Sequence, residues 1–518
     1  MDARIPHFNS WRAREKWLTL SGLNLFRTKS LDQILRDGEA PEHQLRRSLG
    51  AFDVVMLGIG AIVGAGIFAT IGTAAAGDAT RPGAGPALVL SFVITAVACG
   101  FAALCYAEFA AMVPISGSAY TYAYATLGEL VAWIIGWDLI IEYAVGNVAV
   151  AISWGNYFKT LMAGFGLVIP DWLSTDYRTA AHIPGLFASA PHVLGVPIVF
   201  NILAFAIIVL ITTVLVVGIR ESATVNSAMV VLKLLVLALF VAVGWGYVRP
   251  ENMRPFAPNG WAGVQAGAAI VFFAYIGFDA VSTVAEETRN PKRDLPIGII
   301  GSLIICTIIY IVVAVVFTGI IPYDVLVRRL ATEQAEPLTM ALQYANIQKW
   351  GNLIVGLVAF GSVVAHTAVL LVFQLGQPRI FFSMARDGLL PPSFARVHPR
   401  FRTPYVTTIL TGVAVGFCAM FTSIDEMVDL TNIGTLFAFA LVSLGIIVLR
   451  RREPDRARPF RTPWVPLVPI LGILSCVYLM LGLPWVTWIR FALWLVAGLM
   501  VYFFYGRQRS RLTYGHSA

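Results

Sequence analysis

The stretch Leu57-Gly58-Ile59-Gly60-Ala61-Ile62-Val63-Gly64-Ala65-Gly66-Ile67-Phe68 decides the fold of this chain of 518 residues. It is apolar throughout, as a membrane helix is, yet it carries four glycines between positions 58 and 66. Each glycine weakens a helix by roughly 1 kcal/mol relative to alanine. Within lipid, backbone groups released from a helix persist only where protein, ligand or water bonds to them. The stretch therefore predicts a membrane helix that is interrupted.

The same glycines would also allow close helix packing, because Gly60 and Gly64 form a pair of small residues four positions apart. An unwound segment accounts for more of the pattern, since Gly64 and Gly66 flank Ala65. Such a segment would expose N–H groups at the positive end of a half-helix. That end attracts a carboxylate.

A second apolar run, Phe272-Phe273-Ala274-Tyr275-Ile276-Gly277-Phe278-Asp279-Ala280, contains a glycine and then an acid. A carboxylate inside a membrane span is costly and indicates a function. The two runs fall in the first and sixth spans, which hold corresponding places in two halves of five spans. Interrupted helices at corresponding positions indicate the binding site of a transporter with inverted repeats. Direct sequence similarity between the halves is weak, so the repeat is inferred from the breaks.

The composition is that of an all-α integral membrane protein. Hydrophobic residues make up 58% of the chain and charged residues 13%, against about a quarter charged in soluble proteins. A membrane span needs about 20 largely apolar residues. Twelve such runs are predicted, at 50–76, 86–110, 127–158, 194–218, 225–248, 261–285, 296–321, 350–376, 405–423, 429–449, 464–484 and 487–505.

The distribution of basic residues sets the expected orientation. An even number of spans puts both termini on one side, and most of the 37 lysines and arginines then lie in the segments on that side. Cytoplasmic segments carry such an excess. We therefore expect a multi-pass protein of the cell membrane (plasma or inner) with both termini in the cytoplasm. The net charge of +8 is explained by this orientation, and no nucleic-acid partner is expected.

Other function classes leave no trace in the sequence. The five cysteines lie inside hydrophobic runs without a close pair at metal-site spacing, so we expect neither a metal nor another cofactor. No HExxH or GxSxG motif and no phosphate-binding loop is present. An enzyme and an ATP-driven pump are therefore not expected.

Several motifs in a fixed order carry a family resemblance between about Leu31 and Arg450. They are Gly58–Phe68, Gly85–Phe92, Cys105–Phe109, Pro114–Tyr120, Gly128–Leu130, Gly136–Leu139, Glu221–Ala223, Gly277–Asp279, Glu286–Pro291 and Met384–Leu390. Together they make the chain resemble the amino acid–polyamine–organocation superfamily. Within it, the chain is similar to the cationic amino acid transporter family and its bacterial, proton-coupled branch.

That resemblance implies a LeuT-type fold of twelve transmembrane helices. Its expected parts are a basic cytoplasmic tail (1–48), a first inverted repeat (49–248), a second (261–449), two additional C-terminal spans (464–505) and a cytoplasmic tail (506–518). It also implies where an amino acid would bind. Its carboxylate would meet the backbone at Ile62, Gly64, Ala65 and Gly66, and its amino group the carbonyls of Ala274, Tyr275 and Gly277, with Phe278 as a gate.

Lys233 is the most informative charge, because it lies deep inside the fifth span. A lysine stem can extend its ammonium toward the membrane surface, which would leave it without a role. The resemblance implies more, since proton-coupled bacterial relatives place a lysine here, near the ion site of sodium-coupled relatives. Its ammonium would take the place of that cation, and its deprotonation would destabilise the substrate-bound outward state. Animal members of the family tend to have an uncharged residue at this position.

The other deep acids are Glu142 and Asp279. Either could pair with Lys233, relay its proton or attract a cationic substrate side chain. Asp138 lies one helical turn from Glu142 and would share its face. Glu108 is closer to the cytoplasmic interface, where gating or helix packing is expected.

His366 lies well inside the eighth span, without a metal partner at suitable spacing. A lone buried histidine is commonly satisfied structurally. The resemblance implies that this span lines the side-chain pocket, where His366 would narrow the pocket, bond a polar side chain or titrate near neutrality. A protonated His366 would repel arginine and lysine.

The sequence thus predicts a secondary active amino acid transporter working by alternating access, with proton symport of small neutral or cationic L-amino acids as the leading hypothesis. An amino acid or polyamine exchanger without net proton flow is the alternative. A channel or receptor-like sensor is the alternative from another class, but a channel needs a continuous polar lining and the charges here are scattered. The amino acid itself, the oligomeric state, the role of the tail and a small membrane-protein subunit as partner stay open.

Overall fold

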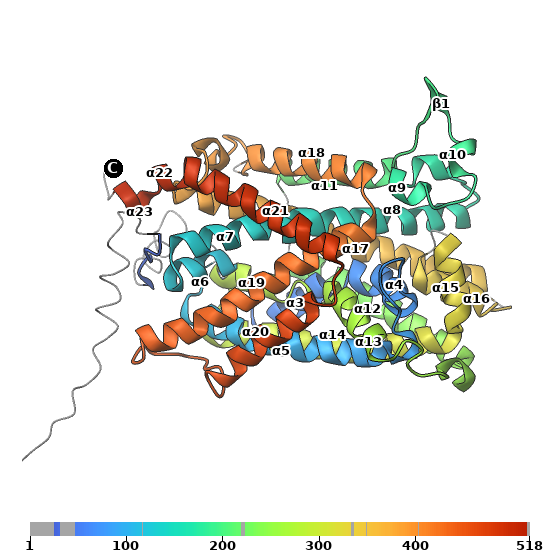
Figure 1. Cartoon of the computed structure of the whole chain (residues 1–518), viewed down its shortest axis with the longest axis horizontal. Coiled ribbons are helices and arrows are strands. Elements are labelled where there is room, and N and C mark those ends of the chain that lie inside the picture. The colour runs from blue at the N-terminus through green and yellow to red at the C-terminus, as the bar shows by residue number, and fades with distance from the viewer. Residues whose placement is uncertain are drawn as a thin grey trace, which may run out of the picture.

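The computed structural model describes residues 25–31, 47–115, 118–218, 223–332, 336–348, 350–401 and 403–514. Within these ranges the chain is mostly helical. Figure 1 shows an elongated bundle whose longer helices run roughly along its horizontal axis. Most of the predicted tail 1–48, part of the motif at 221–223 and the residues after 514 lie outside the described residues.

The first half of the chain contains these elements: α3 (Ala51–Ile62), η2 (Gly66–Thr70), α4 (Ile71–Ala76), η3 (Gly85–Ala87), α5 (Leu88–Met112), α6 (Ser118–Thr126), α7 (Glu129–Ile140), η4 (Ile141–Val145), α8 (Gly146–Gly164), η5 (Asp171–Leu173), α9 (Tyr177–Ala180), α10 (Leu186–Ser189), β1 (His192–Val193), β2 (Val196–Pro197), α11 (Ile202–Val217), α12 (Ala223–Gly244), η6 (Trp245–Tyr247) and η7 (Pro250–Met253). The two strands form a small antiparallel hairpin.

The second half contains α13 (Gly260–Val271), η8 (Phe272–Tyr275), η9 (Asp279–Glu287), α14 (Pro291–Ile320), α15 (Tyr323–Thr332), α16 (Pro337–Tyr344), α17 (Gly351–Arg386), η10 (Pro392–Ala395), α18 (Tyr405–Phe421), α19 (Ile424–Arg452), α20 (Leu467–Met480), α21 (Trp485–Val501), η11 (Tyr502–Gly506), α22 (Arg507–Arg509) and α23 (Arg511–Tyr514).

Nine helical stretches in the described part of the chain are long and apolar enough to cross a membrane. Three shorter apolar helices, α11, α18 and α20, accompany them. Each of the twelve predicted runs coincides with one of these twelve helical stretches. The largest differences are at the eighth run, whose helix continues to Arg386 beyond the predicted end at 376, and at the fourth, whose helix begins at Ile202 and not at 194. The residues before it form the hairpin, and the Asn201 side chain caps the helix by accepting the N–H of Ala204 at 3.0 Å.

Large apolar side chains on the outside of the bundle are exposed on many helices. Examples from different helices are Val97, Leu210, Ile308, Phe417 and Leu493, each more than half exposed. A water-soluble protein would not present so much apolar surface, whereas lipid accepts it. Together with the nine long apolar helices, this surface makes the chain a multi-pass membrane protein.

The bundle has two ends, which we name after a buried charge at each. The Arg81 end contains the loop between α4 and η3, together with α9, α10, α15 and α16, which lie to the right in Figure 1. The Glu108 end contains the last turns of α5 and α19 and the start of α14, and α6 and α22 lie toward it on the left in Figure 1. The middle of the bundle holds the two predicted breaks.

Candidate functional site

The interruption predicted in the first span is present. Helix α3 ends at Ile62, and Val63 takes an extended conformation with φ −76° and ψ 100°. The helix then resumes, and its first backbone bond runs from the N–H of Phe68 to the carbonyl of Gly64 at 3.4 Å. The N–H groups of Gly64, Ala65 and Gly66 therefore belong to the first turn of a new half-helix, where a helix has no carbonyl of its own for them.

Side chains from other spans bond to carbonyls at the end of α3. The hydroxyl of Tyr310 donates to the carbonyl of Ile62 at 3.0 Å. The ammonium of Lys233 donates to the carbonyl of Gly60 at 2.7 Å. Freed carbonyls need such donors when water is absent. Lys233 and Tyr310 thus hold the end of α3 in its interrupted form.

The second break also lies where the sequence predicts it. Helix α13 passes into the short 3-10 helix η8, which ends at Tyr275, and Ile276 is extended with ψ 136°. Gly277 has φ +120°, a conformation that side chains rarely allow. A Cβ at Gly277 would also lie 2.8 Å from the carbonyl carbon and oxygen of Ala61. Glycine is therefore required here by both the backbone angle and the contact with α3.

The structure brings the two breaks into direct contact. A Cβ added to Gly66 would lie 2.1 Å from the Cα of Ala274, so the backbones of the two half-helices touch. N–H groups at the start of η2 and carbonyls at the end of η8 thus meet in one place. The residues predicted to hold a carboxylate and those predicted to hold an amino group share one buried region, since Ile62, Ala65, Ala274 and Tyr275 are all at most 2% exposed.

Phe278, the predicted gate, lies between aromatic rings from two other spans. Its ring centroid is 5.9 Å from that of Tyr106 and 4.9 Å from that of Phe439. The phenol of Tyr275 points elsewhere and donates to the carbonyl of Phe92 at 3.0 Å. The backbone of Tyr275 and the side chain of Phe278 are therefore the parts of this segment that can serve the site.

The deep acids lie together, apart from Lys233. Glu142 comes from η4 and Asp279 from the start of η9, and the two buried carboxyl groups are close enough to interact electrostatically. The N–H of Gly277 donates to Asp279 at 3.3 Å, which ties this acid to the second break. Among the ion pairs of the described residues, none joins Lys233 to Glu142 or Asp279. The pairing of Lys233 with an acid, one of the options open from the sequence, is not seen in this conformation.

Asp138 is buried one turn before Glu142, and both of its carboxylate oxygens lack a hydrogen-bond partner among the described residues. Its Oδ1 lies 2.8 Å from where a Cβ on Gly434 of α19 would stand. Glycine at position 434 thus makes room for the carboxyl group. The middle of the bundle contains three buried acids, none with an ion pair in the described structure.

His366 is fully satisfied in the interior of α17. Its Nδ1 lies 2.6 Å from the carbonyl of Ser362, which can only accept, so Nδ1 carries a hydrogen and donates. Its Nε2 lies 2.8 Å from the hydroxyl of Ser153. The imidazole packs against the rings of Phe68 and Tyr157, with centroids at 5.8 and 5.5 Å. This arrangement suits a neutral histidine that positions Phe68.

Two tyrosines of this region were not predicted from the sequence. Tyr310 bonds the end of α3, and Tyr157 donates to the carbonyl of Phe68 at 2.8 Å. A tyrosine inside an apolar run gives no signal of its own, because such residues are common in helix packing. Their role becomes clear only with the breaks, because interrupted helices leave backbone carbonyls that need a hydrogen-bond donor.

A buried ion-pair network at the Arg81 end was also missed. Arg81 lies 2.6 Å from Asp78 and 2.8 Å from Asp429 of α19. Burial alone would raise the pKa of Asp78, but the Arg81 guanidinium and hydrogen bonds from Thr80 outweigh it and lower that pKa. From the sequence, an aspartate and an arginine three residues apart resemble an exposed loop. The partner on α19, 348 residues away, becomes visible only in the fold.

At the Glu108 end, Glu108 makes contacts of the helix-packing kind, which is one of the two roles expected from the sequence. Glu108 accepts two bonds from Arg450, both at 2.8 Å, and lies 3.2 Å from Arg458. It therefore joins α5 to α19 and the loop that follows, as helix packing predicts. The backbone carbonyl of Glu287 accepts the N–H groups of Ser48 and Leu49 at 2.9 and 3.0 Å. The segment after the second break is thus hydrogen-bonded to the residues that precede α3.

Comparisons with known proteins agree with this architecture. The model of the amino acid permease family matches residues 49–506. The chain is 47% identical to a branched-chain amino acid permease of Bacillus subtilis and 44% identical to a methylthioribose transporter of the same organism, covering 94% of this chain and 99% of each relative. It is 37% identical to the vacuolar cationic amino acid transporter 4 of Arabidopsis thaliana, over 83% of this chain and 68% of that protein. These relatives are transporters and not enzymes, and the chain belongs to the amino acid permease family.

Proposed function

We propose that this permease carries an L-amino acid together with a proton, by alternating access around the two touching breaks. The chain would follow the LeuT-type plan, with the repeats 49–248 and 261–449, two further spans in 464–505, and tails 1–48 and 506–518 in the cytoplasm. The Glu108 end then faces the cytoplasm and the Arg81 end the outside. The excess of basic residues on the side of the termini supports this orientation.

The observation that carries the proposal is the backbone contact between Gly66 and Ala274. A free amino acid has one carboxylate and one ammonium on the same carbon, and the two breaks offer opposite groups within that spacing. N–H groups at Gly64, Ala65 and Gly66 would bind the carboxylate. Carbonyls at the end of η8 would bind the ammonium. Substrate would enter by separating the two half-helices, with Phe278 moving aside as a gate.

The surroundings of His366 favour an uncharged substrate side chain. Phe68, Tyr157 and the neutral imidazole form an aromatic wall beside η2. Such a wall binds an aliphatic side chain through apolar contact and gives an ammonium or guanidinium no ion-pair partner. The 47% identity to a branched-chain amino acid permease agrees with this choice. Cationic amino acids are therefore the second candidate.

Proton coupling is inferred from Lys233. Its ammonium contacts the carbonyl of Gly60 close to the first break, so its charge helps to hold the end of α3. Loss of that proton would remove the charge and weaken the contact. The break and the proton would thus be coupled through one hydrogen bond. The buried pair of Glu142 and Asp279 is a second place where a proton could be held, because one proton between two carboxyl groups removes their repulsion.

Uptake into proteoliposomes tests the proposal. With the inside more alkaline than the outside, we expect radiolabelled leucine, isoleucine or valine to accumulate above the outside concentration, and the accumulation to stop when an ionophore removes the pH gradient. Competition by unlabelled alanine, arginine and lysine ranks the side chains. Methylthioribose belongs among the competitors, since one relative is named as its transporter and this sugar has neither carboxylate nor ammonium.

A matched pair of glycine variants tests the binding site itself. Gly66→Ala would press a methyl group into the backbone of Ala274 and should abolish uptake. Gly100→Ala adds the same methyl group in α5, where nothing lies within 4 Å of it, and should leave uptake near the wild-type rate. Strong uptake by Gly66→Ala, or accumulation of methylthioribose but of no amino acid, would refute the proposed site.

A further inference from the structure

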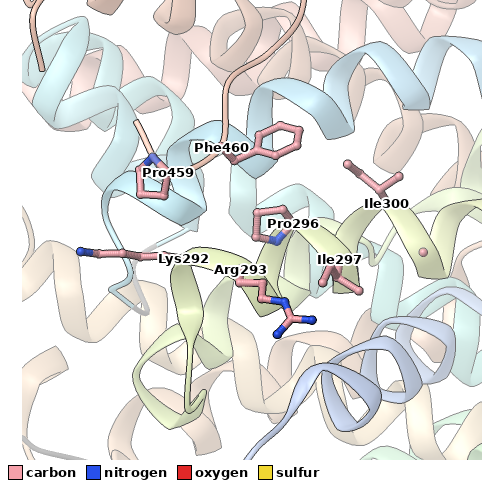
Figure 2. A pocket seen from close by; sticks show the side chains of 8 residues that line it. Lys292, Arg293, Pro296, Ile297, Ile300, Pro459 and Phe460 are labelled. Atoms are coloured by element: carbon pink, nitrogen blue, oxygen red, sulfur yellow. The ribbon is translucent and has the colours of Figure 1, made fainter. Parts of the chain in front are cut away.

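A groove of about 610 Å³ lies on the surface of the bundle at its Glu108 end, away from the two breaks. Figure 2 shows its wall, formed on one side by the start of α14 and on the other by the segment between α19 and α20. Lys292 and Arg293 come from the first turn of α14, while Pro459 and Phe460 face them across Pro296. The other lining residues are Ile297, Ile300 and Gly301.

One side of the groove is cationic. Lys292 and Arg293 are both exposed, and neither has an ion pair among the described residues. The neighbouring acid Asp294 is buried and does not line the groove. The eight lining residues therefore include two positive charges and no negative one.

The other side of the groove continues into a lipid-facing surface. Ile297, Ile304 and Ile308 are 40%, 54% and 59% exposed, and with the half-buried Ile300 they lie at helical spacings of three and four residues. They form one apolar stripe along α14 that starts at the groove and runs toward the middle of the bundle. The change from exposed cations to exposed isoleucines within two turns marks the boundary between headgroups and hydrocarbon.

We propose that this groove binds an anionic phospholipid of the cytoplasmic leaflet. Its phosphate would lie between Lys292 and Arg293, and one acyl chain would follow the stripe of Ile297, Ile304 and Ile308. Phe460 and Pro459 would cover the glycerol region. A free phosphate would use only the cationic side, and a zwitterionic lipid would bring a positive group to two positive side chains. An anionic phospholipid is the occupant that matches both walls.

Native mass spectrometry of the purified full-length chain in detergent tests this. The probes are dioleoyl phosphatidylglycerol, dioleoyl phosphatidylcholine and inorganic phosphate at matched concentrations. We expect one phosphatidylglycerol molecule to be retained preferentially. In Lys292→Gln/Arg293→Gln the retained fraction should fall at least tenfold, because both cations that face the phosphate are removed. Ile300→Trp, which fills the apolar side, should lower retention as well.

The control Arg396→Gln/Arg400→Gln removes the same charge from exposed positions outside the groove and should retain the lipid as the wild type does. Equal loss in both double variants would show a general charge effect and overturn the proposal. Equal retention of phosphatidylcholine and phosphatidylglycerol would also overturn it. So would the finding that inorganic phosphate prevents lipid binding to the wild type while Ile300→Trp has no effect on lipid retention. Thermal unfolding of each variant identifies misfolded protein. If the charge variant fails to fold, the lipid retention of Ile300→Trp still tests the proposal.

Discussion

Arg81 and Glu108, buried near the two ends of this bundle, have ion-pair partners, whereas Lys233 and Asp138 in its middle have none among the described residues. At one end Arg81 contacts two aspartates, and at the other Glu108 contacts two arginines. In the middle, Lys233 has a backbone carbonyl as its partner, and Asp138 has no hydrogen-bond partner among the described residues. Arg81, Glu108, Lys233 and Asp138 are all buried. The two regions therefore differ in whether an opposite charge compensates the buried one.

That difference separates two roles. A charge that is neutralised by close ion pairs is fixed, because removing one partner leaves another charge buried and alone. A buried group without an opposite charge can change its protonation without breaking an ion pair. The paired ends are thus suited to hold helices together, and the unpaired middle is where the proton coupling that we propose would take place. Four substitutions can break or sharpen this contrast.

The largest effect is expected for Glu108→Gln at the paired end. The change leaves the guanidinium groups of Arg450 and Arg458 without their carboxylate, and loss of one partner of a buried ion pair costs about 3–5 kcal/mol. Thermal unfolding in detergent should show a strongly lowered melting temperature. The control Glu453→Gln removes a part-exposed partner of Arg456, which is worth at most about 1 kcal/mol. Similar melting temperatures for the two variants would contradict the structural role of the Glu108 contacts.

Lys233→Ala addresses the middle of the bundle. Without the ammonium the carbonyl of Gly60 loses its donor, and we expect accumulation driven by a pH gradient to fall at least tenfold. Equilibrium binding of the amino acid should be weakened but measurable. Lys159→Ala, which removes a partly exposed lysine paired with Asp171 at the Arg81 end, serves as the control and should accumulate substrate normally. Unchanged pH-driven accumulation by Lys233→Ala would refute the proposed coupling.

Glu142→Gln sharpens the contrast between paired and unpaired acids. No buried cation loses its partner in this variant, so its melting temperature should stay near that of the wild type or rise. The dependence of uptake on external pH should nevertheless flatten several-fold, because the pair with Asp279 can no longer share a proton between two carboxyl groups. A large drop in stability with intact pH dependence would place Glu142 among the structural charges.

The sequence predicts the local features of this molecule well and its long-range contacts poorly. The breaks at Gly64 and Gly277 follow from glycine content and an intramembrane acid, which are properties of short stretches. The contact of Lys233 with Gly60 spans 173 residues, and no local pattern indicates which carbonyl would receive the ammonium. Arg81 was missed for the same reason, because its second aspartate lies on α19. The span predicted from residue 194 includes part of the hairpin before α11, since hydropathy does not register the turn at Leu194 and Gly195.

The smallest effect on uptake is expected for Glu336→Gln, at a carboxyl group that lies toward the Arg81 end but has no ion pair in the described structure. Glu336 precedes α16, outside the candidate spans, and burial raises its pKa to about 8 although hydrogen bonds with Asn156 and Tyr157 oppose the shift.

The sign of its pH dependence follows from that shift. Between about pH 4.5 and 8 the folded chain keeps a proton on Glu336 that the unfolded chain loses, so stability should fall as pH rises, by at most about 1.4 kcal/mol per pH unit. Glu336→Gln cannot ionise, and its melting temperature should gain on the wild type between pH 5.5 and 8. The exposed Glu251→Gln reports the effect of removing one negative charge. If Glu336→Gln and the wild type melt in parallel over this range, Glu336 is compensated by a cation after all, and the rule that end charges are paired would extend to it.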